Sequence, residues 1–441
     1  MNNKGTVIIG GGFSGVACAL ELLKGGARDI TIVEGEERLG GLAFYFTHEG
    51  RRIHTGYHQI LESDTALVDL IRELGLYERV AWKKTKNKVF VDGRIYDLLN
   101  PLDFAKFPLS VVDKARFAVL MARCYATRSW DPLENVSADE WIASIAGRRV
   151  LDDLFAPLFD IKFGLPPSQV SAAWVGSRLG AREASCRFGC VPGHEWTSVI
   201  IEAAQKELEK RGCRILLKTR VEQITRTSGR VDGVRCGGGA TIPCDTVISS
   251  VSPVILSRLV QLDDPILKSI TYIDSLSTIV SVPGVKQDFY WLMCLRPRFL
   301  AGGLFNLSDL NPTLGAPGEI ILNFFTNVDH GSPLLKRPDE ELLDDYQRSY
   351  QSIYGDSLKV NWFKVNRIPF VSAKYVKGYR NPAVRTSLDG LYLCGNYMSY
   401  PSVTSTGTAI ATGLDAARAV MDDRRQRPEK REAAPVRSEA V

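Results

Sequence analysis

The sequence predicts an α/β fold in which a domain of parallel strands is interleaved with an α+β domain of mixed sheet and helices. Three observations predict it. Residues 6–34 read as strand, glycine turn, helix and strand, which is the order found in a parallel sheet. A strand followed by a helix returns after residue 390. The chain of 441 residues is also too long for one simple core, so two or more domains are expected.

The composition is that of a packed globular protein, and it excludes several classes of function. Hydrophobic residues make up 45% of the chain and charged residues 24%. The net charge of +5 is small for this length and indicates no nucleic-acid partner. No window approaches about 18 uninterrupted apolar residues, so no transmembrane segment is expected. The N-terminus leads directly into a strand, so we expect no secretory signal and a cytoplasmic protein. The oligomeric state stays open.

The nine cysteines are scattered along the chain. Their spacing fits no zinc pattern, so no metal site is expected. Cys186 and Cys190 in CRFGC could form a redox pair, but two ordinary reduced thiols are favoured in a cytosolic chain.

The first turn carries the pattern G-x-G-x-x-G between a strand and a helix, which predicts a dinucleotide site. Gly10 allows the tight turn, Gly12 lets the backbone approach a pyrophosphate, and Gly15 allows the helix to pack closely on the strand. Phe13 and Ser14 begin that helix, whose free N–H groups and positive dipole end favour phosphate binding.

A second motif begins where the second strand ends. Glu34, followed by Gly35, can accept hydrogen bonds from a ribose and would repel a 2′-phosphate. The pattern E-x-x-x-R-x-G-G then supplies a guanidinium, which neutralises phosphate, and two glycines, which admit a close backbone. These residues are Arg38, Gly40 and Gly41, followed by Leu42.

Together these motifs resemble those of the superfamily of FAD-dependent amine oxidases, protoporphyrinogen oxidases and phytoene desaturases. The segment HEGRRIHTGYHQI, residues 48–60, is similar to the family's strand pair beside the cofactor. The resemblance implies contacts along the pyrophosphate and ribityl chain for Arg38, Gly40, Gly41 and Leu42. It implies contacts near the isoalloxazine for Gly56, Tyr57 and His58.

Two later stretches extend the resemblance. KTRVEQI, residues 218–224, is similar to the strand that contacts adenine through backbone atoms, with Val221 at the matching position. The stretch from GLYLCGNYM onward resembles the family's terminal motif, in which a helix from about Thr404 points its positive end at the flavin N1–C2=O edge. The implied contacts there are Gly395, Asn396, Ser402, Val403 and Thr404. The resemblance therefore implies a resident FAD and a Rossmann-like FAD-binding domain of the GR2 type.

The elements between these motifs follow from periodicity and turn residues. An amphipathic helix is expected within residues 60–80, with a cap at Ser63 or Asp64 and a stop at Gly75. Asp92-Gly93 predicts a hairpin. Later elements are helices in 100–180, a helix in 197–212, one strand over 213–227, strands in 271–330 and a helix in 342–355.

The resemblance divides the chain into interleaved domains. The FAD-binding domain takes residues 1–60, 189–253 and 376–421. The substrate-binding domain takes residues 61–188 and 254–375. Residues 422–441 lack apolar content and predict a disordered tail.

The leading functional hypothesis is a desaturase or dehydrogenase that moves a hydride from a hydrophobic small molecule to flavin N5, with reoxidation by oxygen or a quinone. Candidate catalytic residues are His58, His194 and Tyr397. A redox-neutral isomerase or mutase that needs reduced FAD, or an amine oxidase, is the alternative. Amine oxidases of the family commonly hold a lysine near N5, whereas LSTIVSVPGV has none before Lys286, which falls too late.

Overall fold

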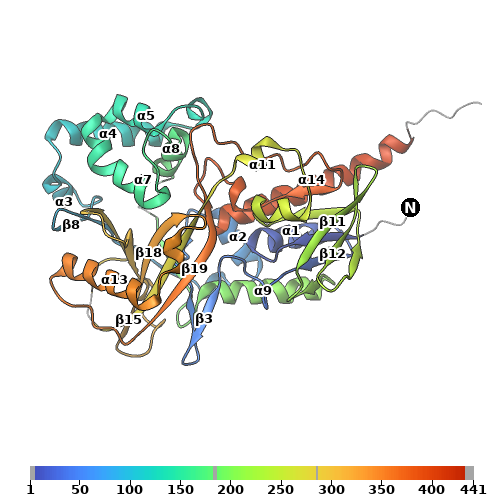
Figure 1. Ribbon diagram of the computed structural model, residues 1–441, viewed down its shortest axis with the longest axis horizontal. Coiled ribbons are helices and arrows are strands. Elements are labelled where there is room, and N and C mark those ends of the chain that lie inside the picture. The colour runs from blue at the N-terminus through green and yellow to red at the C-terminus, as the bar shows by residue number, and fades with distance from the viewer. Residues whose placement is uncertain (1–4, 182–185, 285–286, 433–441) are drawn as a thin grey trace, which may run out of the picture.

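The structure is a computed structural model that describes residues 5–181, 186–284 and 287–432. It is a mixed α/β fold with two large sheets, one of them parallel and the other mostly antiparallel. The parallel sheet and its helices form one end of the elongated molecule, and the larger sheet and a group of helices form the other (Figure 1).

The parallel sheet has the strand order β10–β2–β1–β14–β20. Most of its strand residues are buried on both faces, as expected for a parallel sheet covered by helices. The strands are β1 (Thr6–Ile9), β2 (Ile30–Val33), β10 (Arg214–Leu216), β14 (Thr246–Ser249) and β20 (Leu391–Leu393).

Three long helices accompany this sheet, and α1 (Phe13–Lys24) lies between α9 (Trp196–Lys210) and α14 (Thr406–Glu432) (Figure 1). Gly413 allows α14 to approach α1 closely, since a Cβ there would lie 2.1 Å from the Ser14 carbonyl oxygen. The last helix of the chain is thereby fixed against the first.

The second sheet has seven strands in the order β19–β15–β18–β17–β16–β7–β8. Its longest members are β15 (Tyr272–Pro283), β18 (Glu319–Asp329) and β19 (Trp362–Ala373), which pair antiparallel. The others are β7 (Asn87–Val91), β8 (Arg94–Tyr96), β16 (Trp291–Arg296) and β17 (Gly303–Asn306).

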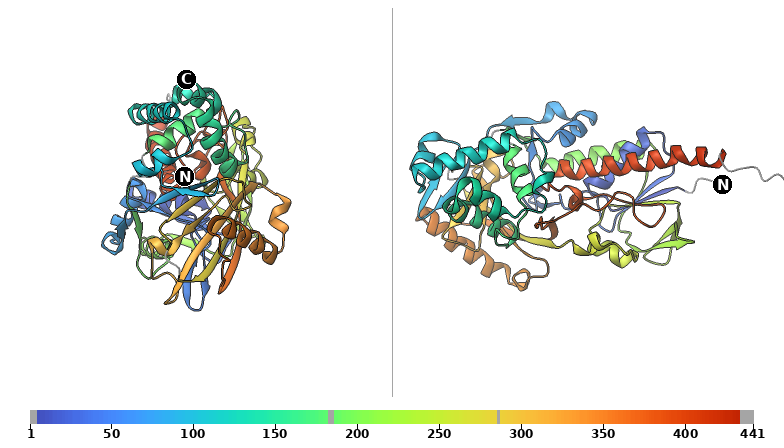
Figure 2. Two further views of the ribbon diagram at one scale, coloured as in Figure 1. Left: turned by 90° about the vertical axis from the view of Figure 1, so that its left-hand side faces the viewer. Right: turned by 90° about the horizontal axis from the view of Figure 1, so that it is seen from above.

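Helices surround this second sheet at its end of the molecule (Figures 1 and 2). One group contains α3 (Pro101–Lys106), α4 (Val111–Ala126), α5 (Ala138–Ala146), α7 (Ala156–Phe163) and α8 (Ala172–Gly180). Helix α13 (Asp339–Tyr354) lies apart from that group. Short helices are α2 (Thr65–Glu73), α6 (Arg148–Val150), α10 (Pro253–Leu259), α11 (Pro265–Ser269) and α12 (Leu307–Leu310).

Small sheets complete the fold. Strands β3 (Tyr45–His48) and β4 (Arg51–His54) form a hairpin, and β5 (Ile60–Leu61), β6 (Ala81–Lys83) and β9 (Phe188–Cys190) form a three-stranded sheet. The third contains β11 (Val221–Thr227), β12 (Arg230–Cys236) and β13 (Thr241–Pro243).

Several sequence-based expectations are confirmed and two are wrong. The hairpin at Asp92-Gly93 joins β7 to β8, and α2 begins directly after Asp64. The single strand expected over 213–227 is instead two strands in different sheets. The chain turns between them at Lys218, whose φ is +50°. The left-handed conformation of a lysine has no sequence signal, because glycine or asparagine normally occupies it.

The expected disordered tail overlaps α14, so residues 422–432 are helical, and residues 433–441 lie outside the described residues. Two polar side chains at the start of this stretch have partners on or next to the parallel sheet. Asp423 accepts hydrogen bonds from Arg385 and from the Tyr392 hydroxyl, and Arg424 donates to Thr6. Throughout the described ranges, every helix is too short or too polar to cross a membrane.

Candidate cofactor and active site

The glycine loop after β1 is shaped by close backbone contacts. Gly10 has a φ of +98°, which favours glycine, and a Cβ on Gly15 would lie 2.2 Å from the Gly10 carbonyl oxygen. Gly12 differs, because the nearest atom to its Cβ would be the Gly41 Cα at 3.6 Å. The Gly40 N–H donates to the Gly11 carbonyl at 2.9 Å. The two glycine stretches predicted from sequence therefore lie against each other.

Glu34 closes this arrangement from the end of β2. Its carboxylate is buried and accepts the Gly11 N–H at 2.7 Å and the Glu36 N–H at 2.9 Å. The Thr219 N–H donates to the Glu34 carbonyl at 2.9 Å, which brings the start of β11 and Val221 beside the loop. A Cβ on Gly35 would lie 3.0 Å from the Arg220 side chain. The predicted ribose and adenine residues are neighbours.

The terminal motif reaches the same loop through β14. The Cys394 N–H donates to the Ser249 carbonyl at 3.0 Å, and the Ser250 hydroxyl donates to the Gly10 carbonyl at 3.0 Å. Gly395, with a φ of +137°, lies beside Ser250. The carboxyl ends of β1, β2, β14 and β20 thus meet at one edge of the sheet, where open α/β sheets bind ligands.

Several polar atoms at this edge are buried and have no hydrogen-bond partner within the described residues. They include the Arg38 Nε, the Ser249 Oγ and the His58 Nε2. The Arg38 guanidinium is positioned by the Tyr45 ring, 4.1 Å from its centroid, and by the Tyr45 carbonyl at 3.2 Å. Buried polar groups in folded proteins normally have partners. These donors and acceptors, with the open backbone at Gly12, fit a phosphate-bearing flavin cofactor.

Asn396 and Thr404 are both held by neighbours in the terminal motif. The Asn396 amide donates to the Phe370 and Val371 carbonyls at 3.5 and 3.3 Å. The Thr404 hydroxyl lies 3.0 Å from the Tyr375 hydroxyl. These contacts fix the entry to α14.

Asp64 also lies at the N-terminus of α14, a role that its sequence position did not predict. Its carboxylate accepts the Gly407 N–H at 3.1 Å and the Ser405 hydroxyl at 3.1 Å. Burial raises the pKa of Asp64, although the hydrogen bonds to Ser405 and Gly407 oppose this. The positive end of the helix is therefore partly compensated by this carboxyl group.

His58 is kept neutral by its surroundings. Burial, together with His54, lowers the pKa of His58 to about 4. The ring centroids of His54 and His58 are 5.8 Å apart. A neutral imidazole with a buried, unpaired Nε2 within the described part of the chain can accept or donate one hydrogen bond to a ligand.

His194 and its neighbour Glu195 differ in burial. The His194 side chain is exposed, whereas the Glu195 carboxylate is completely buried. Glu195 lies 2.7 Å from His54 Nδ1 and accepts the N–H groups of Thr197 and Ser198 at the start of α9. Burial opposes the charge, but His54 and these donors lower the pKa of Glu195 to about 2. Sequence reasoning missed this pair, because nothing in either segment identifies the other.

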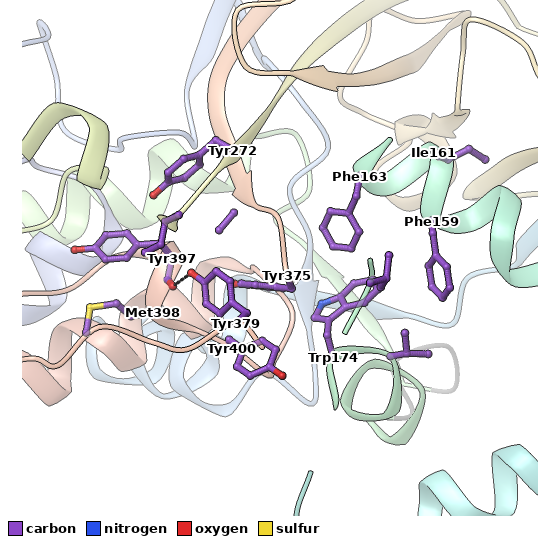
Figure 3. Close-up of a cluster of buried hydrophobic side chains, with 14 of the residues drawn as sticks. Phe159, Ile161, Phe163, Trp174, Tyr272, Tyr375, Tyr379, Tyr397, Met398 and Tyr400 are labelled. Carbon is purple, nitrogen blue, oxygen red and sulfur yellow. Dashed lines mark hydrogen bonds between the residues drawn. The ribbon is translucent and has the colours of Figure 1, made fainter. Parts of the chain in front are cut away.

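Tyr397 lies in a cluster of buried tyrosines with Tyr272, Tyr375, Tyr379 and Tyr400 (Figure 3). Its carbonyl accepts the Tyr379 hydroxyl at 2.5 Å. Its own hydroxyl is buried without a partner among the residues described. Burial raises the pKa of Tyr397 well above its usual value, so the phenol stays protonated.

The strand expected to carry an amine-oxidase lysine is β15, which has none between Tyr272 and Pro283. Lys286 lies outside the described residues.

Comparison with known proteins identifies the class to which this site belongs. Residues 13–421 match the model of the flavin containing amine oxidoreductase family. The chain therefore belongs to this family, and it is an FAD-dependent oxidoreductase.

The proteins to which the chain is similar carry the names of different enzymes. The chain is 21% identical to the 15-cis-phytoene desaturase of Solanum lycopersicum over 95% of this chain and 77% of that protein. It is 25% identical to the coproporphyrinogen III oxidase of Mycobacterium leprae over 65% of this chain and 68% of that protein. Among solved structures, reduced UDP-galactopyranose mutase superposes with a TM-score of 0.76 at 17% identity, covering 95% and 96% of the two chains.

Proposed function

We propose that the chain is an oxidoreductase of the desaturase or dehydrogenase type, which acts on a hydrophobic small molecule and uses oxygen or a quinone as final acceptor. The observation that carries the proposal is the packing of the Tyr57 ring, next to His58, against two phenylalanines. Its ring stacks on Phe305, with centroids 4.2 Å apart, and lies 5.3 Å from Phe325. The similarity to phytoene desaturases along 95% of the chain supports the same substrate class.

The cofactor is proposed to lie across the carboxyl edge of the parallel sheet, in a GR2-type domain of residues 1–60, 189–253 and 376–421. Gly10, Gly12 and Gly15 would give the pyrophosphate access to the backbone, and Glu34 would bind the ribose. Arg38, with its buried free Nε in the described structure, would pair with phosphate. FAD supplies the hydride acceptor of such a reaction.

The remaining proposed contacts divide between the two ends of the cofactor. Val221, held near Glu34, would contact adenine. Residues 56–58, 395–396 and 402–404 would surround the flavin ring. Residues 61–188 and 254–375 would cover the ring and bind the substrate.

His58 is the proposed proton acceptor of this site. With a pKa lowered to about 4 by burial and by His54, its ring is neutral near pH 7 and offers a free lone pair, although it is a weaker base than an exposed imidazole. Tyr397 can donate but cannot act as a base, because burial raises its pKa. His194 is exposed and does not face the same surroundings.

A redox-neutral reaction is the second candidate, and the similarity to reduced UDP-galactopyranose mutase supports it. An amine oxidase is less favoured, because β15 supplies no lysine.

The test is an anaerobic titration of purified holoenzyme with an apolar polyene, a porphyrinogen and a primary amine, followed at the flavin absorbance bands. We expect stoichiometric bleaching by the polyene or the porphyrinogen and recovery of colour when oxygen or a quinone is added. Bleaching by the amine alone would establish an amine oxidase. Turnover that requires pre-reduced flavin and consumes no acceptor would establish the redox-neutral alternative.

A further inference from the structure

The exposed large hydrophobic side chains of the molecule are concentrated in one short segment. Among the described residues, seven such side chains are exposed, and six of them lie between residues 99 and 125. Single exposed apolar residues are ordinary, whereas a contiguous group marks an interaction surface. The six are Leu99, Leu102, Val111, Val112, Val119 and Tyr125, and we call them and the exposed face of α4 the α3–α4 face.

The exposed half of α4 is apolar along one strip and basic along one edge. Successive residues of an α-helix are about 100° apart around its axis. This spacing places small and branched apolar side chains in one strip. Val111 is 83% exposed, and Val112 and Val119 are each 58% exposed. Ala115 and Ala122 lie between them, and the edge carries Arg116 and Arg123, all exposed. The opposite side of the helix packs inward through Leu120 and Cys124.

The fully exposed charged side chains of this segment are all cations. Residues 99–128 contain five cations and two carboxylates. On α4 the one carboxylate, Asp113, is buried and accepts the Ser110 hydroxyl at 2.6 Å. An apolar strip bordered by arginines, without an exposed carboxylate on the same helix, is the pattern of a helix that lies in a lipid–water interface.

The position of the face suits a flat partner. Figures 1 and 2 place α3 and α4 at the end of the molecule that is remote from the parallel sheet. Helix α4 packs on α5 and α8, and α8 carries Trp174 on its inner side against Phe163 at 4.8 Å. The α3–α4 face is therefore the outer surface of the helices that border the buried aromatic side chains of the second sheet.

We propose that the α3–α4 face docks the protein on an anionic lipid surface. The apolar strip of α4 lies in the interface, and Arg116 and Arg123 pair with acidic headgroups. A second copy of the chain is a poorer occupant. Across a two-fold axis the arginine edges would meet surfaces of the same charge, with no exposed carboxylate on α4 to pair them. The docking extends beyond the proposed oxidation, since it concerns where the enzyme works and not its chemistry.

The experiment is co-sedimentation of the holoenzyme with vesicles of phosphatidylcholine alone and of phosphatidylcholine mixed with phosphatidylglycerol. We expect binding to the mixed vesicles, weaker binding at high salt, and little binding to phosphatidylcholine alone. The V111Q/V112Q/V119Q variant should bind at least about tenfold more weakly. Each arginine should contribute about fivefold to the affinity for the mixed vesicles. R116E/R123E should therefore bind more than about twentyfold more weakly.

The matched control is K206E/K210E, which makes the same change of charge on exposed positions of α9. It should keep its affinity within about twofold. Unchanged FAD content and thermal unfolding in all variants would show that folding is intact. The proposal is overturned if the wild-type protein does not sediment with anionic vesicles, or if R116E/R123E binds as well as the control. It is also overturned if V111Q/V112Q/V119Q converts a dimer to a monomer in light scattering, because the face would then join two copies.

Discussion

The edge of the parallel sheet and the surroundings of the second sheet are built from different kinds of contact. At the first, backbone meets backbone, as where Gly15 packs on the Gly10 carbonyl and Gly40 donates to Gly11. At the second, side chains from distant strands fill the space, as where Tyr57 stacks on Phe305. At the first, a methyl group added at Gly15 has no room. Exchanges between apolar side chains of similar volume at the second are tolerated better.

The largest loss of stability and of FAD binding is expected at Gly15. In Gly15→Ala the new Cβ would meet the Gly10 carbonyl oxygen at 2.2 Å and the Ile8 side chain at 3.2 Å. Because both neighbours belong to the buried βα unit, we expect a loss of at least about 3 kcal/mol in the free energy of unfolding and almost no bound FAD. Thermal unfolding and the ratio of flavin to protein absorbance measure both effects.

Gly12→Ala is the matched variant. Its Cβ would lie 3.6 Å from the nearest atom, and Gly12 has an ordinary φ of −70°. The apoprotein should keep its stability within about 1 kcal/mol and lose FAD affinity, because the methyl group occupies the approach of the pyrophosphate. Normal FAD binding by both variants would show that the cofactor does not use this loop.

The pair of Glu195 and His54 allows a second test, in which the contact is made by buried side chains and not by backbone atoms. Glu195→Gln removes the charge that faces His54, so we expect the free energy of unfolding to fall by about 2–3 kcal/mol. The folded-state pKa of Glu195, about 2, lies below its unfolded value of about 4.3. Its contribution is therefore complete above about pH 4.3 and is lost as pH falls toward 2. Urea unfolding between about pH 5 and 2 should show a steeper loss for the wild type than for the variant.

The control is Glu202→Gln on the same helix. Glu202 pairs with Arg52 of β4, but both side chains are more than 40% exposed. The loss should stay within about 0.5 kcal/mol, because exposed ion pairs contribute little. Equal losses in the two variants would contradict the structural role assigned to the buried pair.

The features that could be predicted from sequence are those with local requirements. Short motifs predict the turn at Gly10, the close packing at Gly15 and the placement of Glu34. In these motifs a glycine or an acid at a fixed spacing is required by the local geometry. The approach of the terminal motif to the first loop was implied by resemblance and agrees with the contacts of Ser250.

The features that could not be predicted depend on residues far apart in the chain. The sequence predicts Ser63 or Asp64 as the cap of α2, yet the Asp64 carboxylate accepts the N–H of Gly407, 343 residues later. The sequence predicts His194 as a candidate and not its neighbour Glu195, but the fold buries Glu195 and leaves His194 exposed. The polar residues after 421 were interpreted as a tail, because pairing with Thr6, Arg385 and Tyr392 has no local pattern.

Asp64 lies at the N-terminus of α14 and offers a finer test. Asp64→Asn keeps an acceptor for the Gly407 N–H and removes a negative charge at the N-terminus of α14. If the flavin pyrimidine lies there, as proposed, its reduced form gains stability, and the reduction potential should rise by roughly 30 mV. Equilibrium reduction against a reference dye measures the shift. Asp69→Asn, at a 69% exposed position of α2, is the control and should leave the potential unchanged.

The smallest effect is expected at the far end of α14. Asp423→Asn weakens the interaction with Arg385, whose Nε lies 3.0 Å from both carboxylate oxygens, and the bond from the Tyr392 hydroxyl at 2.7 Å. The Arg385 side chain is half exposed, so the midpoint of thermal unfolding should fall by only about 1–2 °C. FAD content should not change. This contact lies beside the parallel sheet, but away from the edge at which the cofactor is proposed to bind. Asp422→Asn, one residue earlier, is the control, since the ion pair of Asp422 with Arg425 is exposed and 4.0 Å long. If the two variants melted at the same temperature, the Asp423 contacts would add no more to stability than the exposed pair of Asp422.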